Sequence, residues 1–262
     1  MNKNWQILLI SIFVIATVIT LWAFTLNENN KRTIKDIIIN INYNNKDTLI
    51  VKEDINDAIK DLLLNRNISQ IDLGKLEIRC QNIPWVKTAD VSLSIDGILK
   101  IDITQRNPLL RIWLNNEYSF YMDDMGFFPL REGYPARIIN VLGYLPKLNN
   151  NYWYDKNTDS LNYDANFYYK LISLAKTIYA DEFICALTEQ IYISPDHKVS
   201  IEPKIFNHTI IIGDISDINI KFLKLKKLYQ YLFKKDAINQ YKLINLNYKN
   251  QVVCTKKNII NP

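Results

Sequence analysis

One uninterrupted apolar run, from Ile7 to Leu26, limits what this chain can fold into more than any other feature. As a helix, a run of this length is about 30 Å long, which matches the hydrocarbon core of a bilayer. A cleavable signal peptide has a shorter apolar core followed by small residues, whereas this run ends in the bulky Trp22–Leu26 segment. We therefore expect residues 7–26 to be an uncleaved transmembrane helix, between a short tail (1–6) and a linker (27–34).

The charged residues beside this run do not decide on which side of the membrane the rest of the chain lies. Lys3 precedes the run, whereas Lys31, Arg32 and Lys35 follow it. A count of positive charges would keep the long part in the cytoplasm, but long domains are translocated largely regardless of charge. The residues alone leave the topology open.

Composition argues against several classes of function. The net charge is +5, and the densest basic stretch, Lys221–Lys235, interleaves lysines with apolar residues at helical spacing. We interpret this stretch as the solvated basic face of a helix and expect no nucleic-acid partner. Cys80, Cys185 and Cys254 are far apart and have apolar neighbours, which predicts three reduced, structural thiols.

The sequence has no pattern typical of an enzyme. His197 and His208 lack a ligand partner at helical spacing, and Asp123-Asp124 precedes Met125-Gly126, where a turn is expected. Neither a glycine-rich phosphate loop nor a nucleophile motif occurs in the sequence. We expect no catalytic residues, no cofactor, no metal site and no small-molecule substrate.

Residues 35–106 have the pattern of a small α+β domain. Alternation over Lys35–Tyr43 predicts a strand, and apolar residues at helical spacing over Ile55–Leu63 predict an amphipathic helix. Asp72 is a candidate N-cap for a second helix that ends near Asn82.

A β-hairpin is expected after the second helix. Ala89–Ile95 and Leu99–Thr104 both alternate between apolar and polar residues, and Asp96-Gly97 separates them as a two-residue turn. The predicted order of this domain is therefore β-α-α-β-β, with two helices covering one sheet.

Residues 107–262 are predicted to form a β-rich domain with two or three helices, which makes the whole chain α+β. The helices are expected at about Phe167–Ile178 and Ser216–Lys235, and residues 144–164 are expected to be a loop. Strands are expected at Leu109–Leu114, Tyr118–Asp123, Arg137–Leu142, Ile191–Ser194, Lys198–Ile201, Thr209–Ile212, Lys242–Tyr248 and Gln251–Lys256.

A series of short motifs follows a recognisable order. They are Ile83-Pro84-Trp85-Val86, Ala89-x-Val91, Leu99-x-Ile101-x-Ile103, Arg106-x-Pro108, Asp123-x-x-Gly126 and, near the C-terminus, Ile244–Tyr248 with Asn250–Val253. In order and spacing this series resembles the FtsQ/DivIB family of bacterial cell-division proteins. The family often has Asp and Arg just before the tyrosine, where this chain has Asn245 and Asn247.

The resemblance implies a POTRA-like domain over residues 35–106 and a β-domain over residues 107–262. It also implies a non-enzymatic scaffold of the divisome that binds FtsB and FtsL and helps regulate septal cell-wall synthesis. The N-terminus would be cytoplasmic and the bulk periplasmic, at the inner membrane of the division septum. The alternatives are a membrane-tethered envelope enzyme, such as a wall hydrolase, and a POTRA-type transport or assembly factor.

The final predicted strand, Gln251–Lys256, is the candidate partner-binding edge. A last strand can lack a neighbour on one side, and its unpaired backbone groups can then pair with an incoming strand. Val252 and Cys254 are expected on one face of this strand, with Gln251 and Val253 on the other.

The resemblance implies that FtsB binds this edge, with Tyr248, Asn250 and Lys256 at the matching positions. The alternative is a plain edge that Lys256 and Lys257 protect from aggregation. The full set of candidate partner-binding residues is Tyr248, Asn250, Gln251, Val252, Val253, Cys254, Thr255 and Lys256.

Overall fold

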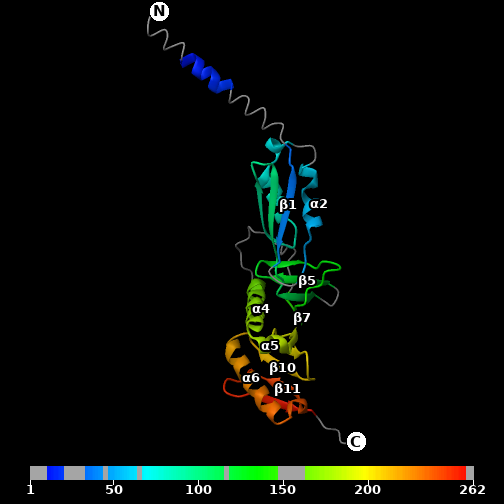
Figure 1. Cartoon of the computed structure of the whole chain (residues 1–262). Coiled ribbons are helices and arrows are strands. Elements are labelled where there is room, and N and C mark those ends of the chain that lie inside the picture. Colours follow the sequence, from blue (N-terminus) through cyan, green and yellow to red (C-terminus); the bar gives the residue numbers. More distant parts are fainter. Residues whose placement is uncertain are drawn as a thin grey trace, which may run out of the picture. The chain divides into compact units, whose positions relative to one another are not determined.

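The structure, a computed structural model, describes residues 11–20, 33–43, 47–63, 67–114, 118–146 and 163–257. The chain divides into two compact units, Met1–Arg106 and Asn107–Pro262 (Figure 1). Each unit contains both helices and strands, in agreement with the predicted α+β class.

The predicted membrane anchor lies only partly in the described residues. Residues 11–20 are helical, whereas residues 7–10 and 21–26 fall outside the description, as do the tail and residues 27–32 of the linker. None of the described helices has both the length and the apolar character that crossing a bilayer requires. The transmembrane helix stays a prediction.

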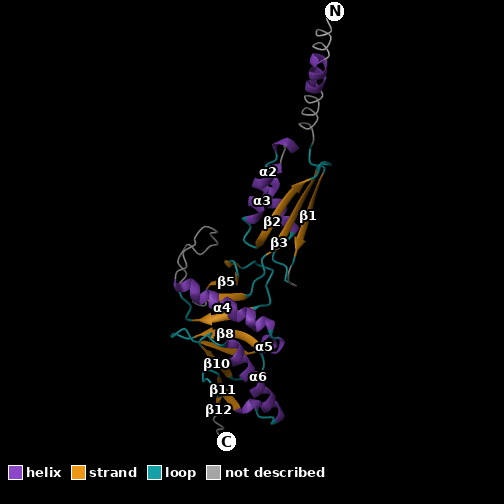
Figure 2. Ribbon diagram, turned by 90° about the vertical axis from the view of Figure 1, so that its left-hand side faces the viewer, coloured by secondary structure: helices purple, strands orange, loops and turns teal. Residues whose placement is uncertain are grey.

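The first unit contains the predicted order of two helices and three strands. Its elements are β1 (Asp36–Asn42), α2 (Lys52–Leu63), a 3₁₀ turn η1 (Ile68–Gln70), α3 (Leu73–Gln81), β2 (Val86–Leu93) and β3 (Ile98–Gln105). The sheet order is β1-β3-β2, with β1 parallel and β2 antiparallel to β3. Figure 2 shows α2 and α3 on one face of this sheet.

The core of the first unit explains why these residues form these elements. Helix α2 buries Ile55 and Ile59, which lie one turn apart and therefore on one face. Asp72 accepts a hydrogen bond from the backbone N–H of Lys75 at 3.1 Å, so it caps α3 as predicted. The helices pack against the inward side chains of β3, which include the fully buried Leu99.

The predicted two-residue hairpin turn is wrong. The N–H of Ser94 donates to the carbonyl of Ile98 at 2.9 Å, which leaves a three-residue loop, Ile95–Gly97. Only Gly97, with φ of +85°, is left-handed in this loop, whereas a type I′ turn needs two left-handed residues. A left-handed residue at the end of a three-residue loop is the common alternative, and it places Ile95 at the tip instead of in the strand.

The described residues of the second unit form a nine-stranded sheet, in the order β12-β11-β10-β9-β8-β7-β4-β5-β6. Its strands are β4 (Leu110–Leu114), β5 (Tyr118–Asp123), β6 (Gly126–Pro129), β7 (Ile139–Gly143), β8 (Thr188–Ile193), β9 (Val199–Pro203), β10 (Thr209–Gly213), β11 (Tyr241–Asn245) and β12 (Val253–Lys256). The helices are α4 (Tyr163–Ala180), α5 (Glu182–Leu187), α6 (Ile218–Lys234) and the 3₁₀ turn η2 (Ile238–Gln240).

The helices of the second unit cover one face of its sheet (Figures 1 and 2). Fully buried side chains alternate along the strands, as Leu110 and Ile112 do in β4, and pack against Leu171 of α4 and Leu225 of α6. Strand β6 and helix α5 were not predicted, because elements of four and six residues are too short for a periodic pattern.

The interpretation of Lys221–Lys235 as a solvated face is wrong for Lys221, and two half-exposed lysines, Lys224 and Lys226, also bind protein groups. Lys221 is buried and donates through Nζ to the carbonyl of Asp214 at 2.6 Å. Lys226 forms an ion pair with Asp181, and this bond lowers the pKa of the Asp181 carboxyl. Lys224 reaches two backbone carbonyls near the C-terminal strand. These three lysines connect α6 to the loop at Asp214, to the start of α5 at Asp181 and to the loop before β12.

Candidate functional site: the free edge of strand β12

Strand β12 is the last strand in the sheet order, so its one strand neighbour in the described part of the chain is β11. The two strands are antiparallel, with Asn245 opposite Val253 and Tyr241 opposite Lys256. The register shifts between Tyr241 and Leu243, where β11 has one extra residue, so alternation along β12 itself is uninterrupted. The strand is shorter than predicted, because Gln251 and Val252 precede it. Among the described residues, no strand pairs with its other side, which is therefore a candidate edge for an incoming strand.

The two faces of this edge differ in exposure. Val252 and Cys254 are half-buried against the core, whereas Val253 and Thr255 are exposed, as is Gln251 before the strand. The alternation agrees with the expected faces. Burial raises the pKa of the Cys254 thiol, so this cysteine stays protonated and acts as a small apolar side chain.

The direction of each backbone group in β12 follows from one hydrogen bond. The N–H of Lys257 donates to the carbonyl of Gln240 at 2.8 Å, one residue outside the Tyr241–Lys256 pair. In an antiparallel ladder this bond identifies that pair as non-hydrogen-bonded. The N–H and C=O of Lys256 therefore point away from β11, and by alternation those of Cys254 do too.

The loop before β12 is held in a defined position by α6. The ammonium group of Lys224 donates to the carbonyl of Leu246 at 3.0 Å and to that of Tyr248 at 2.6 Å. The side chain of Asn247 packs on Gly213, where a Cβ atom would come within 2.5 Å of the Asn247 Oδ1. The loop therefore presents Tyr248, which is 48% exposed, from a fixed backbone beside the free edge.

The candidate site thus contains two kinds of residue. Val253–Lys256 supply backbone groups and exposed side chains along the edge, and Tyr248, Asn250 and Gln251 lie exposed in the adjoining loop. Sequence reasoning missed Lys224 and Gly213. Both are far from β12 in the chain, and the basic pattern of α6 gave no sign that one lysine binds carbonyl oxygens.

The residues considered for chemistry lie elsewhere. His197 lies in the turn between β8 and β9, His208 is buried beside Tyr229, and Asp123 accepts the N–H of Met125 at 2.8 Å in a turn. In the described ranges, no group of three or more His, Cys, Asp and Glu side chains could hold a metal ion. The three cysteines are unpaired. The β12 edge suits pairing with an extended segment of another chain.

Residues 107–255 match the family described as FtsQ/DivIB, C-terminal related. The match starts where the second compact unit starts and ends in β12. Because it covers more than half of the chain, the chain belongs to this family, whose members are cell-division proteins. No curated protein matches the chain.

We predict that Lys224→Met loosens the loop before β12, because the Leu246 and Tyr248 carbonyls lose a charged donor. Hydrogen bonds to charged groups contribute about 1.5–3 kcal/mol, so amides of residues 246–250 should exchange at least about tenfold faster. Hydrogen exchange followed by NMR or mass spectrometry measures this. Lys227→Met, an exposed lysine on the same helix, is the matched control. Equal exchange in the two variants would contradict the anchoring role.

Proposed function

We propose that this protein is a non-enzymatic scaffold of the division machinery that helps regulate septal cell-wall synthesis. Its partners are division proteins of the FtsB and FtsL type, and one of them binds by adding a strand to β12. Membership of the FtsQ/DivIB-related family supports the division role and a role without catalysis.

The single observation that carries the binding proposal is the outward direction of the Cys254 and Lys256 backbone groups at the end of the sheet. An extended partner segment would pair with them and so continue the sheet. Tyr248 beside the edge would supply an aromatic anchor, a residue type enriched at binding hot spots. The exposed Lys256 ammonium would add little affinity.

The same proposal gives each remaining part of the chain a domain type and a location. Residues 35–106, with their β-α-α-β-β order, are a POTRA-like domain, and residues 107–262 are the partner-binding β-domain. The apolar residues 7–26 are the anchor in the inner membrane, with residues 1–6 in the cytoplasm and the bulk in the periplasm. This topology rests on the apolar run and on the family.

Lys256→Pro tests the binding edge. Proline removes an N–H that points away from β11, so the fold should persist while one intermolecular hydrogen bond is lost. We expect about tenfold weaker binding of a periplasmic FtsB segment in calorimetry. Lys256→Ala, which keeps the N–H and removes the charge, should bind within about threefold of the wild type.

Val253→Pro is unsuitable for this test, because by alternation its N–H points toward β11 and the change would damage the sheet itself. If folded Lys256→Pro binds the segment like the wild type, the partner does not add a strand to β12. A melting temperature close to that of the wild type shows that the variant is folded.

An alkaline phosphatase fused after Pro262 tests the proposed topology. We expect an active fusion in the membrane fraction, because this enzyme folds only outside the cytoplasm, and loss of membrane association on deletion of residues 7–26. An inactive phosphatase fusion together with an active β-galactosidase fusion would place the bulk in the cytoplasm and refute the topology.

A further inference from the structure

Three partly exposed aromatic rings of the second unit lie around the buried ring of Tyr229, and we call them the aromatic ledge: Phe183 of α5, Phe206 of the β9–β10 loop and Phe233 of α6. The ring centroids of Phe183 and Tyr229 are 5.6 Å apart, those of Tyr229 and Phe233 5.8 Å, and those of Phe206 and Phe233 5.7 Å. Phe183 is 36% exposed and Phe233 48%. Connected exposed rings mark interaction sites more often than single surface hydrophobes do.

The backbone holds Phe206 in this ledge at a conformational cost. Its φ is +74°, a left-handed conformation that bulky residues rarely adopt. Such strain is found preferentially at functional sites. Beneath it, the Nε2 of His208 lies 2.6 Å from the Tyr229 hydroxyl oxygen, and burial lowers the pKa of His208 to about 4. The floor of the ledge is therefore uncharged at neutral pH.

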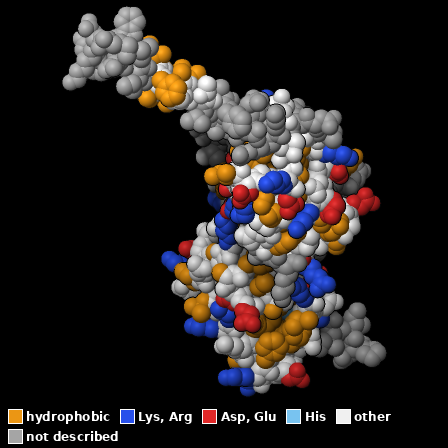
Figure 3. Space-filling view, turned by 45° about the horizontal axis from the view of Figure 1, so that its top comes forward, with side chains coloured by type: hydrophobic (Ala, Val, Ile, Leu, Met, Phe, Trp, Pro, Cys, Tyr) orange, Lys and Arg blue, Asp and Glu red, His pale blue; other side chains and the backbone are white. Residues whose placement is uncertain are grey.

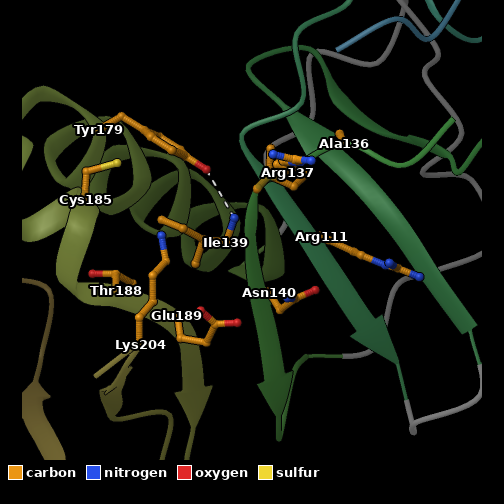
Figure 4. Close-up of a pocket in the computed structure, with 11 residues that line it drawn as sticks. Arg111, Ala136, Arg137, Ile139, Asn140, Tyr179, Cys185, Thr188, Glu189 and Lys204 are labelled. Atoms are coloured by element: carbon orange, nitrogen blue, oxygen red, sulfur yellow. Dashed lines mark hydrogen bonds between the residues drawn. The ribbon is translucent and has the colours of Figure 1, made fainter. Parts of the chain in front are cut away.

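A positively charged cleft of about 340 Å³ lies at the start of strands β4, β7 and β8. Figure 4 shows Lys204 and Glu189 on one side of it and Asn140 and Arg111 on the other. The charged side chains that face the cleft are those of Lys204, Arg137 and Glu189, whereas the guanidinium of Arg111 points away from it. This excess of positive charge suits an anionic group.

The cations of the cleft are available to a ligand. In the described part of the chain, neither Arg137 nor Lys204 forms an ion pair. The guanidinium of Arg111 is held by the Ser119 hydroxyl at 3.2 and 3.3 Å and lies 4.4 Å from the centroid of the Trp113 ring. Glu189 lines the same cleft, but within the described residues it forms no ion pair with Arg137 or Lys204.

The cleft and the ledge are neighbours on one unit. Lys204 lines the cleft, and two residues later Phe206 belongs to the ledge, with the exposed Ile205 between them.

Basic residues also flank the ledge. Lys234 and Lys235 follow Phe233 directly, and the charge of Lys257 acts on His208. Figure 3 shows apolar side chains gathered in a patch on the second unit, with charged side chains around it.

We propose that the cleft and the aromatic ledge together bind one acidic segment of a partner protein. A carboxylate of that segment enters the cleft, where Lys204 and Arg137 attract it, and a bulky apolar side chain lies on the rings of Phe206 and Phe233. Opposite charges fix the direction of the segment, and the aromatic contact supplies affinity. This surface is separate from the β12 edge, so the protein can hold two partners, or two parts of one partner.

A labelled synthetic peptide tests the proposal on the full chain in lipid nanodiscs, with empty nanodiscs as the blank. The probe is a 12-residue peptide with several glutamates followed by Trp-Leu, and binding is followed by fluorescence anisotropy. We expect saturable binding that weakens at least tenfold in Lys204→Glu and in Phe233→Ala. The same peptide with lysines in place of its glutamates should not bind.

Matched variants distinguish binding at this site from non-specific electrostatic or hydrophobic binding. Lys227→Glu and Tyr231→Ala change an exposed lysine and an exposed aromatic residue of α6 outside the ledge, and both should bind the peptide within twofold of the wild type. Lys256→Pro should do so too, which keeps this test independent of the β12 proposal.

Three results would overturn the proposal. The first is no saturable binding of the acidic peptide. The second is an equal loss of binding in the control variants. The third is a concentration-dependent dimer in sedimentation that Phe233→Ala abolishes, because the ledge would then be an interface between two copies of this chain.

Discussion

The antiparallel pairing of β12 with β11 determines which groups of the C-terminal edge remain available. Because Lys257 donates to Gln240 just outside the Tyr241–Lys256 pair, the Lys256 backbone faces away from the sheet. Strand β11 is also paired in parallel with β10, so β12 is hydrogen-bonded to a strand that is itself held on both sides. The contact of Lys224 with two carbonyls fixes the loop between these strands. An edge held in this way loses little freedom on binding, which favours strand addition.

Much of this fold could be predicted from local patterns. The amphipathic spacing of Ile55 and Ile59, the cap at Asp72 and the alternation of the strands all reflect which side chains face a core. Three features depend on contacts between distant residues and gave no local signal. The length of the Ile95–Gly97 loop depends on which residues of β2 and β3 pair, the role of Lys224 depends on where α6 packs, and the direction of the Lys256 N–H depends on the ladder register.

The candidate binding surfaces also combine features that local patterns predict with features that depend on contacts between distant residues. Alternation of residues along the chain predicted the last strand and its two faces, although the strand starts two residues later than predicted. The aromatic ledge could not be predicted, since its rings come from α5, the β9–β10 loop and α6. A scaffold of the kind proposed binds through such surfaces, and the second unit offers two kinds: a backbone edge, and a cleft beside aromatic rings. A backbone edge accepts many sequences, whereas charged and aromatic groups select among them.

Amide hydrogen exchange along β12, in the presence and absence of a periplasmic FtsB segment, tests the central claim most directly. Strand addition predicts that the outward amides of Cys254 and Lys256 gain protection on binding. The amides of Val253 and Thr255 point toward β11 and should already be protected and change little. If the amides of Cys254 and Lys256 exchange at the same rate with and without the segment, while other parts of the second unit become protected, binding at this edge is contradicted.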